Sequence, residues 1–211
     1  MKKLALAVVA AALLAAPFAA SAQLQLGGRL ALALPQGETA KGFKQSDLTR
    51  LQVPLELDLA WRFGNFSPGV YISIAPGLLN KDLAAQCDAA NISCATAGVR
   101  MGVEGIYDFA PEAPASAWVG GRVGVESLGW GVDNGGNKDT LAASGLSIGV
   151  EGGFDFRLGF LSVGPYASLE FGKYSKTSSN ASGSTVTESI PSGEQTWHTW
   201  IVVGAKGTIT F

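Results

Sequence analysis

Thirteen charged residues recur at alternate positions along apolar segments, where they could pair with one another or line an ion path. In the segment 51–63, for example, Glu56, Asp58 and Arg62 share one parity, while leucine, valine and aromatic residues occupy the other. An isolated buried ion costs several kcal/mol, so charges enclosed in one lumen must be paired or hydrated. We predict a plug of salt bridges, and an ion pathway or gate is the alternative. The set is Arg29, Glu56, Asp58, Arg62, Arg100, Glu104, Asp108, Arg122, Glu126, Glu151, Asp155, Glu170 and Lys206.

Other candidates for chemistry are few. Cys87 and Cys94 are the only cysteines, and in a chain with an export signal a disulfide that shapes an exposed loop is expected before a metal site. His198 is the only histidine and has no matched nucleophile motif, so we predict a structural hydrogen bond. The segment 133–139 is rich in oxygen ligands but lacks the glutamate and spacing of an EF-hand, which favours a turn. We therefore predict no catalytic residue, no cofactor and no metal.

The first 22 residues are predicted to be a cleavable signal peptide. Lys2 and Lys3 precede an alanine- and leucine-rich stretch, and Ala20-Ser21-Ala22 fits the small-x-small cleavage pattern. A membrane-anchoring helix is the alternative, because the uncharged run is long enough to span a bilayer. Residues 23–211 then form one domain with 13 basic and 17 acidic residues, which provides no basic footprint for nucleic acid.

Strict alternation of apolar and polar residues predicts eight strands in the mature chain. Side chains of a strand point alternately to its two faces, and each segment has about the length that crosses a bilayer at a tilt. Long polar connections alternate with short ones, so both termini lie at the short-loop end. The strands are predicted at 24–34, 51–63, 70–79, 98–109, 117–130, 145–156, 161–173 and 196–211, and the long loops at 35–50, 80–97, 131–144 and 174–195.

The apolar face of these strands is predicted to face lipid. A soluble, lipocalin-like barrel would show the same alternation with its apolar side inward. The polar face, however, carries many small residues between its charges, as the crowded interior of a narrow barrel requires. Aromatic residues also gather on the apolar face at the short-loop end, as in an interfacial girdle. They are Trp61, Phe63, Tyr107, Phe109, Phe154, Phe156 and Phe211, with Phe171 and Trp197 toward the opposite rim.

The signal, the eight alternating segments and the ending 207–211 resemble the small outer-membrane β-barrels of the OmpA transmembrane domain and OmpX group. The resemblance is one of pattern over the whole mature chain. It implies an all-β fold, an eight-stranded antiparallel up-and-down transmembrane β-barrel, located in the bacterial outer membrane as a monomer. It also implies that Gly207, Ile209 and Phe211 form a signal read by the barrel-assembly machinery.

The function expected from this pattern is non-enzymatic. We expect a role in envelope structure and surface interaction, with outer-membrane lipid around the barrel and an extracellular ligand contacted through the four long loops. A porin-like narrow pore or a lateral conduit for small molecules is the alternative. An enzyme that acts on lipid is the third class considered.

Insertion in cells should depend on the last residue. Deleting Phe211, or changing it to Asp, should reduce the amount of protein in the outer membrane while leaving refolding in detergent nearly intact. The reason is that an aromatic residue at the last lipid-facing position serves recognition more than packing. Fractionated membranes measure this, and unchanged insertion of both variants would show that the ending is not an assembly signal.

Overall fold

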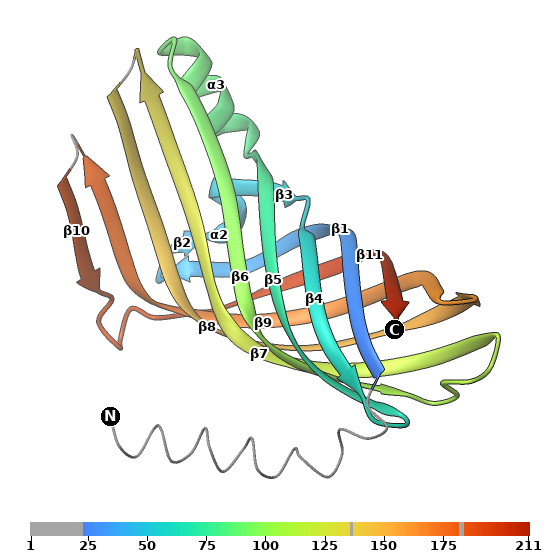
Figure 1. Cartoon of the computed structure of the whole chain (residues 1–211). Coiled ribbons are helices and arrows are strands. Elements are labelled where there is room, and N and C mark those ends of the chain that lie inside the picture. The colour runs from blue at the N-terminus through green and yellow to red at the C-terminus, as the bar shows by residue number, and fades with distance from the viewer. Residues whose placement is uncertain (1–22, 136, 182–183) are drawn as a thin grey trace.

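The computed structural model describes residues 23–135, 137–181 and 184–211, so the predicted signal peptide 1–22 lies outside the described residues. Strands make up most of the described chain (Figure 1). In chain order the elements are β1 (Gln23–Ala40), β2 (Phe43–Lys44), α2 (Gln45–Leu48), β3 (Thr49–Gln52), β4 (Leu55–Arg62), β5 (Phe66–Leu79), α3 (Lys81–Ala89), β6 (Ser93–Asp108), β7 (Ala115–Asn134), β8 (Asn137–Leu158), β9 (Leu161–Ala181), β10 (Ser184–Ser189) and β11 (Trp197–Thr210).

The sheet closes on itself as a ring of eight antiparallel strands, which confirms the predicted fold class. β3 and β4 form one strand of the ring, interrupted at Val53 and Pro54, where proline cannot donate a ladder hydrogen bond. Neighbours in sequence are neighbours in the ring, and β1 closes it against β11 from Gln25↔Thr210 to Gly37↔His198. The closed ring leaves no strand edge inside the membrane, where an unpaired backbone group would cost several kcal/mol.

Burial alternates residue by residue as the sequence pattern requires. On β4, Glu56 and Asp58 are buried in the lumen, whereas Leu57 between them is 63% exposed on the outside. The same exterior carries Ile72, Val103 and most other large apolar side chains of the barrel. An apolar exterior around a charged interior is the inverse of a lipocalin-like barrel, so the alternative of a soluble barrel does not fit the structure.

The long connections are more regular than the sequence suggested. The predicted loop 131–144 is mostly strand, because the β7–β8 ladder continues to Asn134↔Asn137 and turns at Gly135, where φ is +62°. The predicted loop 174–195 contains the end of β9 and all of β10, which pair from Lys176↔Ser189 to Ala181↔Ser184. These two loop predictions were wrong: a hairpin ladder continues wherever antiparallel partners remain in register, even when both faces are polar.

The other two long connections contain helices. Segment 35–50 extends β1 to Ala40 and then forms β2 and α2, and segment 80–97 forms α3 before β6 begins. The Asn80 side chain caps α3 by accepting a hydrogen bond from the Asp82 amide at 2.9 Å. Among the described residues, no helix is both long and apolar enough to cross a membrane. We call the end of the barrel that carries these segments the long-loop end (Figure 1).

The aromatic side chains predicted for the short-loop end are on the barrel exterior. Trp61, Phe154 and Phe211 are exposed, and Tyr107 and Phe109 meet edge-to-face with ring centroids 5.4 Å apart. Phe66 and Phe160 at the short turns are exposed as well and extend the group. Aromatic rings at this level suit the boundary between hydrocarbon and water.

A charge on the lipid-facing exterior should destabilise the barrel far more than the same charge on the hairpin at the long-loop end. Val103 on β6 and Val186 on β10 offer a matched pair, since they are 52% and 53% exposed. Val103→Arg should lower the free energy of unfolding in lipid vesicles by about 2–4 kcal/mol. Val186→Arg, on the polar hairpin, should change it by less than about 0.5 kcal/mol. Urea titration measures both, and equal losses would contradict the assigned membrane-facing surface.

Candidate functional site

The centre of the lumen holds two arginines that share carboxylates. Arg29 on β1 donates to Glu151 at 2.6 Å and to both oxygens of Glu104 at 2.7 and 2.8 Å. Arg122 on β7 donates to Glu56 at 2.7 Å and to Glu104 at 2.8 Å. Glu104 therefore bridges the two guanidinium groups. We call these five residues the central ion cluster.

Strand register and the narrowness of the barrel together assemble the central ion cluster. The ladders place Arg29 opposite Glu56 on β4 and Glu104 opposite Arg122 on β7. The contacts from Arg29 to Glu104 and Glu151 join strands that are not neighbours, so these side chains cross the lumen. An eight-stranded barrel is just wide enough for side chains to fill. All five side chains are almost completely shielded from solvent.

Inward aromatic rings cover the luminal cations. The Arg122 guanidinium lies 4.2 Å from the ring centroid of Tyr71, and that of Arg100 lies 4.7 Å from the centroid of Trp200. The corresponding distances are 5.6 Å from Arg29 to Tyr166 and 4.5 Å from Lys206 to Trp118. Each ring presents its negative face to a desolvated cation, which is a favourable contact.

These four rings were not among the predicted site residues, because aromatic residues were expected only on the lipid-facing side of the strands. Trp118, Tyr166 and Trp200 share the parity of the charged residues on their own strands, and Tyr71 shares that of Ser73 on β5, which carries no charge. Applying the period-two rule to every residue would therefore have placed them in the lumen.

Two glycines make room for Tyr71. A Cβ atom on either Gly102 or Gly124 would lie 2.3 Å from a backbone carbonyl oxygen of the neighbouring strand. The Cβ on Gly124 would also lie 2.7 Å from the Tyr71 hydroxyl oxygen, and the one on Gly102 would lie 3.0 Å from the Tyr71 ring. All these distances are shorter than ordinary van der Waals contact. The small residues that the sequence places between the luminal charges thus leave space for a large ring from a nearby strand.

A second polar layer lies above the central ion cluster, toward the long-loop end. Arg100 is within 3.3 Å of Glu170 and 3.5 Å of Glu126, and it donates to the Gln52 side chain at 3.1 Å. The His198 Nε2 atom contacts the other oxygen of Glu126. His198 therefore has a buried hydrogen-bonding partner, in keeping with the structural role predicted for it.

Tyr174 and Gln45 close this second layer from above. The ring of Tyr174 stacks on the imidazole of His198 with centroids 4.2 Å apart, and Gln45 of α2 donates to the Tyr174 hydroxyl at 3.4 Å. Gln45 and Gln52 were not in the predicted set of luminal charges. Gln45 lies in a predicted loop, and Gln52, on the polar face of its predicted strand, is uncharged. Both are fully buried, so the long-loop segment 35–50 contributes directly to the lumen.

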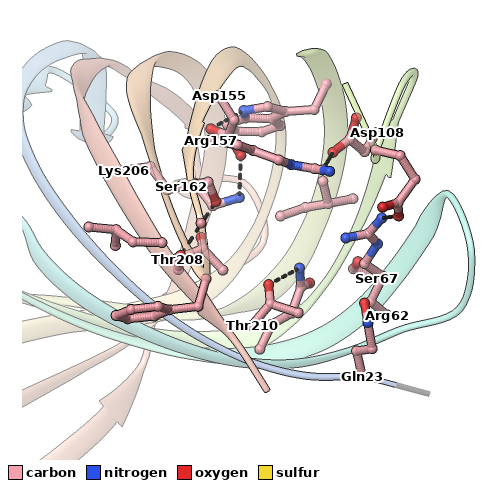
Figure 2. Close-up of a pocket in the computed structure, with 17 residues that line it drawn as sticks. Gln23, Arg62, Ser67, Asp108, Asp155, Arg157, Ser162, Lys206, Thr208 and Thr210 are labelled. Carbon is pink, nitrogen blue, oxygen red and sulfur yellow. Dashed lines mark hydrogen bonds and ion pairs between the residues drawn. The ribbon is translucent and has the colours of Figure 1, made fainter. Parts of the chain in front are cut away.

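The short-loop end of the lumen is an open polar cavity of about 240 Å³ (Figure 2). Arg157 donates to Asp108 at 3.3 Å on one side of it. Deeper in, Trp118 donates from Nε1 to Asp155 at 3.0 Å, and the Lys206 ammonium lies 3.9 Å from the same carboxylate. The cavity reaches Asp155 and Lys206, and no residue of the central ion cluster lines it, so the lumen is open at its mouth and filled at its centre.

The structure divides the thirteen predicted luminal charges between these layers. Asp58 lies 3.4 Å from Arg29 at the edge of the central ion cluster. Arg62 is at the short-loop rim, where it contacts the exposed Glu112 at 2.5 Å. Asp108 is half-buried at the same rim, whereas the other twelve residues of the set are buried.

The remaining predicted site residues lie away from the lumen. A disulfide joins Cys87 in α3 to Cys94 in β6 at the long-loop end. Phe211 is exposed at the short-loop rim, where its amide donates to the Leu24 carbonyl at 2.9 Å. Gly207 and Ile209 lie on the same outward-facing side of β11, and recognition of this ending remains a prediction. Within the described ranges, no cluster of His, Cys, Asp and Glu side chains is arranged to hold a metal ion.

Comparisons by sequence find no relative of this chain. No known protein family matches it, and no curated protein matches it either.

Comparison with solved structures gives clear matches. A major outer membrane protein from Thermus thermophilus aligns with a TM-score of 0.58 at 12% identity, covering 89% of this chain and 99% of that one. Neisserial surface protein A aligns with a TM-score of 0.54 at 12% identity, covering 90% and 97% respectively. Together with the closed antiparallel ring, these likenesses show that the chain has the fold of the small bacterial outer-membrane β-barrels.

Proposed function

We propose that the protein is a non-enzymatic integral outer-membrane barrel, sealed at its centre, that supports the envelope and presents its long-loop end for surface interaction. The central ion cluster is the observation that carries this proposal. Its arginines and glutamates fill the lumen and contact each other at 2.6–2.8 Å. Bidentate arginine–carboxylate contacts of this kind are among the stronger hydrogen bonds in proteins.

A sealed lumen follows from the energetics of opening it. An ion that passed the centre would have to separate buried partners, and each unpaired buried charge would cost several kcal/mol. Arg29 and Arg122 come from strands on different sides of the barrel, so no rotation of a single side chain clears a path. The ion pairs of the cluster thus connect strands that are not hydrogen-bonded to each other in the sheet.

The long-loop end supports the surface-interaction part of the proposal. The β7–β8 and β9–β10 hairpins, α2 and α3 project there, and the disulfide between Cys87 and Cys94 ties α3 to the start of β6. Fixed loops lose less entropy when they bind a partner than disordered ones do. The proposed partners are membrane lipid around the barrel, the barrel-assembly machinery during biogenesis and an extracellular ligand at this end, with the barrel as a monomer.

A narrow pore is the second candidate function, and the polar cavity at the short-loop mouth favours it. This cavity admits water to the level of Asp155 and Lys206. The pore requires that the central ion cluster open, whereas the sealed barrel requires that it stay closed. Conductance therefore separates the two candidates.

The refolded wild-type protein should show no steady conductance in planar bilayers, or only small and rare openings. Arg122→Ala should increase cation passage, because it removes one of the two cations of the central ion cluster and leaves three glutamates around Arg29 alone. Arg157→Ala is the matched control, since it removes a guanidinium at the rim and leaves both buried layers intact. A large and stable wild-type conductance would overturn the sealed barrel and favour the pore.

The free energy of unfolding should fall more when an arginine is removed from the centre of the lumen than when one is removed from its rim. Arg122→Ala should lower the free energy of unfolding by about 3–5 kcal/mol, because it removes a cation and leaves buried carboxylates with uncompensated charge. Arg157→Ala should lower it by less than about 1 kcal/mol, since its ion pair with Asp108 is partly exposed. Urea unfolding in lipid vesicles measures both variants. Equal losses would mean that the central ion cluster does not hold the barrel together.

A further inference from the structure

A β-bulge near the long-loop end places two lysines on the same face of β9. Lys173 and Lys176 are three residues apart, but their partners on β8 are only two apart, because Ser175 is an extra residue in β9. Without the bulge the two lysines would point to opposite faces, since side chains alternate along a strand. A Cβ atom on Gly145 would overlap the Lys173 carbonyl oxygen, so the close approach of β8 and β9 at the bulge requires glycine.

The ladder partners of the two lysines show that this face is the exterior of the barrel. Lys173 lies between Leu146 on β8 and Trp197 on β11, which are 69% and 62% exposed. Residues directly opposite each other on neighbouring strands share a face. Lys176 is one pair farther from the membrane centre, beside Ser144 and about 7 Å along the strand from Lys173.

The exterior of β7, β8 and β9 changes from apolar to polar at the level of these lysines. The last fully apolar row across the three strands consists of Val123, Ile148 and Phe171. Two rows farther out, the exterior residues are Ser127, Ser144 and Lys176. Such a change marks the boundary between hydrocarbon and headgroups, and an exposed tryptophan beside Lys173 suits the same boundary. Both lysines therefore lie at the level of the lipid headgroups.

A shallow groove of about 350 Å³ crosses this boundary on the outside of the barrel. Met101 and Leu146 contribute to its apolar part, and Ser144, Ser175 and Lys176 contribute to its polar part. Because the groove opens on the lipid-facing exterior, the molecules next to it are membrane lipids. An acyl chain fits the apolar part while the headgroup of the same lipid reaches the polar part.

The charge of the groove is positive and is not compensated by the protein. Neither Lys173 nor Lys176 forms an ion pair within the part of the chain that the structure describes. Glu126 borders the groove, but its carboxylate points into the lumen, where it contacts His198. Lysines at the headgroup level attract anionic lipids, and serine hydroxyls can donate hydrogen bonds to phosphate oxygens.

We propose that this groove binds a membrane lipid with an anionic, phosphate-bearing headgroup. The phosphate lies between Lys173 and Lys176 and accepts hydrogen bonds from the nearby serine hydroxyls. One acyl chain follows Met101 and Leu146 toward the membrane centre. The inference rests on the proposed function in that the barrel spans a membrane, and it adds the class of lipid and the place where that lipid binds.

Quenching of Trp197 fluorescence by brominated lipid tests the proposal, because this side chain lies beside Lys173. The protein is reconstituted at low ionic strength in vesicles that all contain phosphatidylglycerol and phosphatidylcholine in the same ratio, with only one of the two lipids brominated. The difference between wild type and Trp197→Phe isolates the signal of Trp197. We expect brominated phosphatidylglycerol to quench it more strongly, per lipid present, than brominated phosphatidylcholine.

Two other quenching results would overturn the proposal. Equal quenching by the two lipids would show that the groove accepts any lipid. No quenching by either lipid would show that another protein chain covers the groove.

Removal of the lysines tests which groups hold the headgroup. Lys173→Gln and Lys176→Gln should each lower the preference for phosphatidylglycerol about fivefold, and the double variant should show none. Lys81→Gln is the matched control, since it removes the same charge from an exposed position on α3 and should leave the preference unchanged. Wild-type preference in the double variant, or an equal loss in Lys81→Gln, would mean that the two lysines do not form the site.

The source of the phosphate is tested with inorganic phosphate. At matched ionic strength it should lower the preference for phosphatidylglycerol no more than sodium chloride does. A stronger effect of phosphate would show a site for a soluble anion and overturn the assignment to lipid.

These outcomes are distinguishable from failure of the proposed function. Conductance reports on the central ion cluster, and quenching of Trp197 reports on the barrel exterior. A conducting barrel that prefers phosphatidylglycerol at Trp197 overturns the sealed barrel alone, and a silent barrel without this preference overturns the lipid site alone. Correct folding of each variant is checked by the shift of the unboiled band in SDS electrophoresis.

Discussion

The rest of the structure depends on the sharing of carboxylates between Arg29 and Arg122. An eight-stranded ring encloses a lumen that must be filled, and the lipid-facing exterior already uses the apolar residues of every strand. Polar side chains must then fill the interior, and charges can do so only in pairs. Glu104 accepts hydrogen bonds from both arginines and so links the side chains that enter the lumen from opposite sides of the barrel. Aromatic rings fill the space beside the cluster, and small residues leave room for these rings. A charged interior can therefore also be densely packed.

The two ends of the lumen differ in a way that matches their surroundings. At the short-loop end the cavity is small and polar, and its ion pairs are partly exposed. At the long-loop end the interior is first closed by Tyr174, His198 and Gln45 and then becomes apolar. The barrel therefore has a polar cavity at its short-loop mouth and a partly open apolar cavity at its long-loop end, and the ion-paired layers lie between them.

Continuation of the β ladder beyond the membrane creates the space at the long-loop end. β7, β8 and β9 run past the level of the second polar layer, and their outer parts curve away from the barrel (Figure 1). Short loops at this position would have left the mouth open above Tyr174. Instead, the extended sheet supplies a wall, α2 and α3 face it, and the disulfide between Cys87 and Cys94 anchors the second helix.

The sequence by itself determined the strand number, the inward and outward faces and the identity of the luminal charges, because a period of two assigns each side chain to a face without knowledge of the fold. The same rule could have placed the aromatic rings next to the luminal cations in the lumen as well. Only the tertiary structure decided which charges pair, since the contacts from Arg29 to Glu104 and Glu151 cross the lumen between strands that are not neighbours. It also decided that most of 131–144 and most of 174–195 belong to strands, because a polar hairpin has no hydrophobic pattern and is held by register alone. The apolar cavity beyond them arises from β1, β2, the two helices and three strands, and no local pattern in the chain brings those segments together.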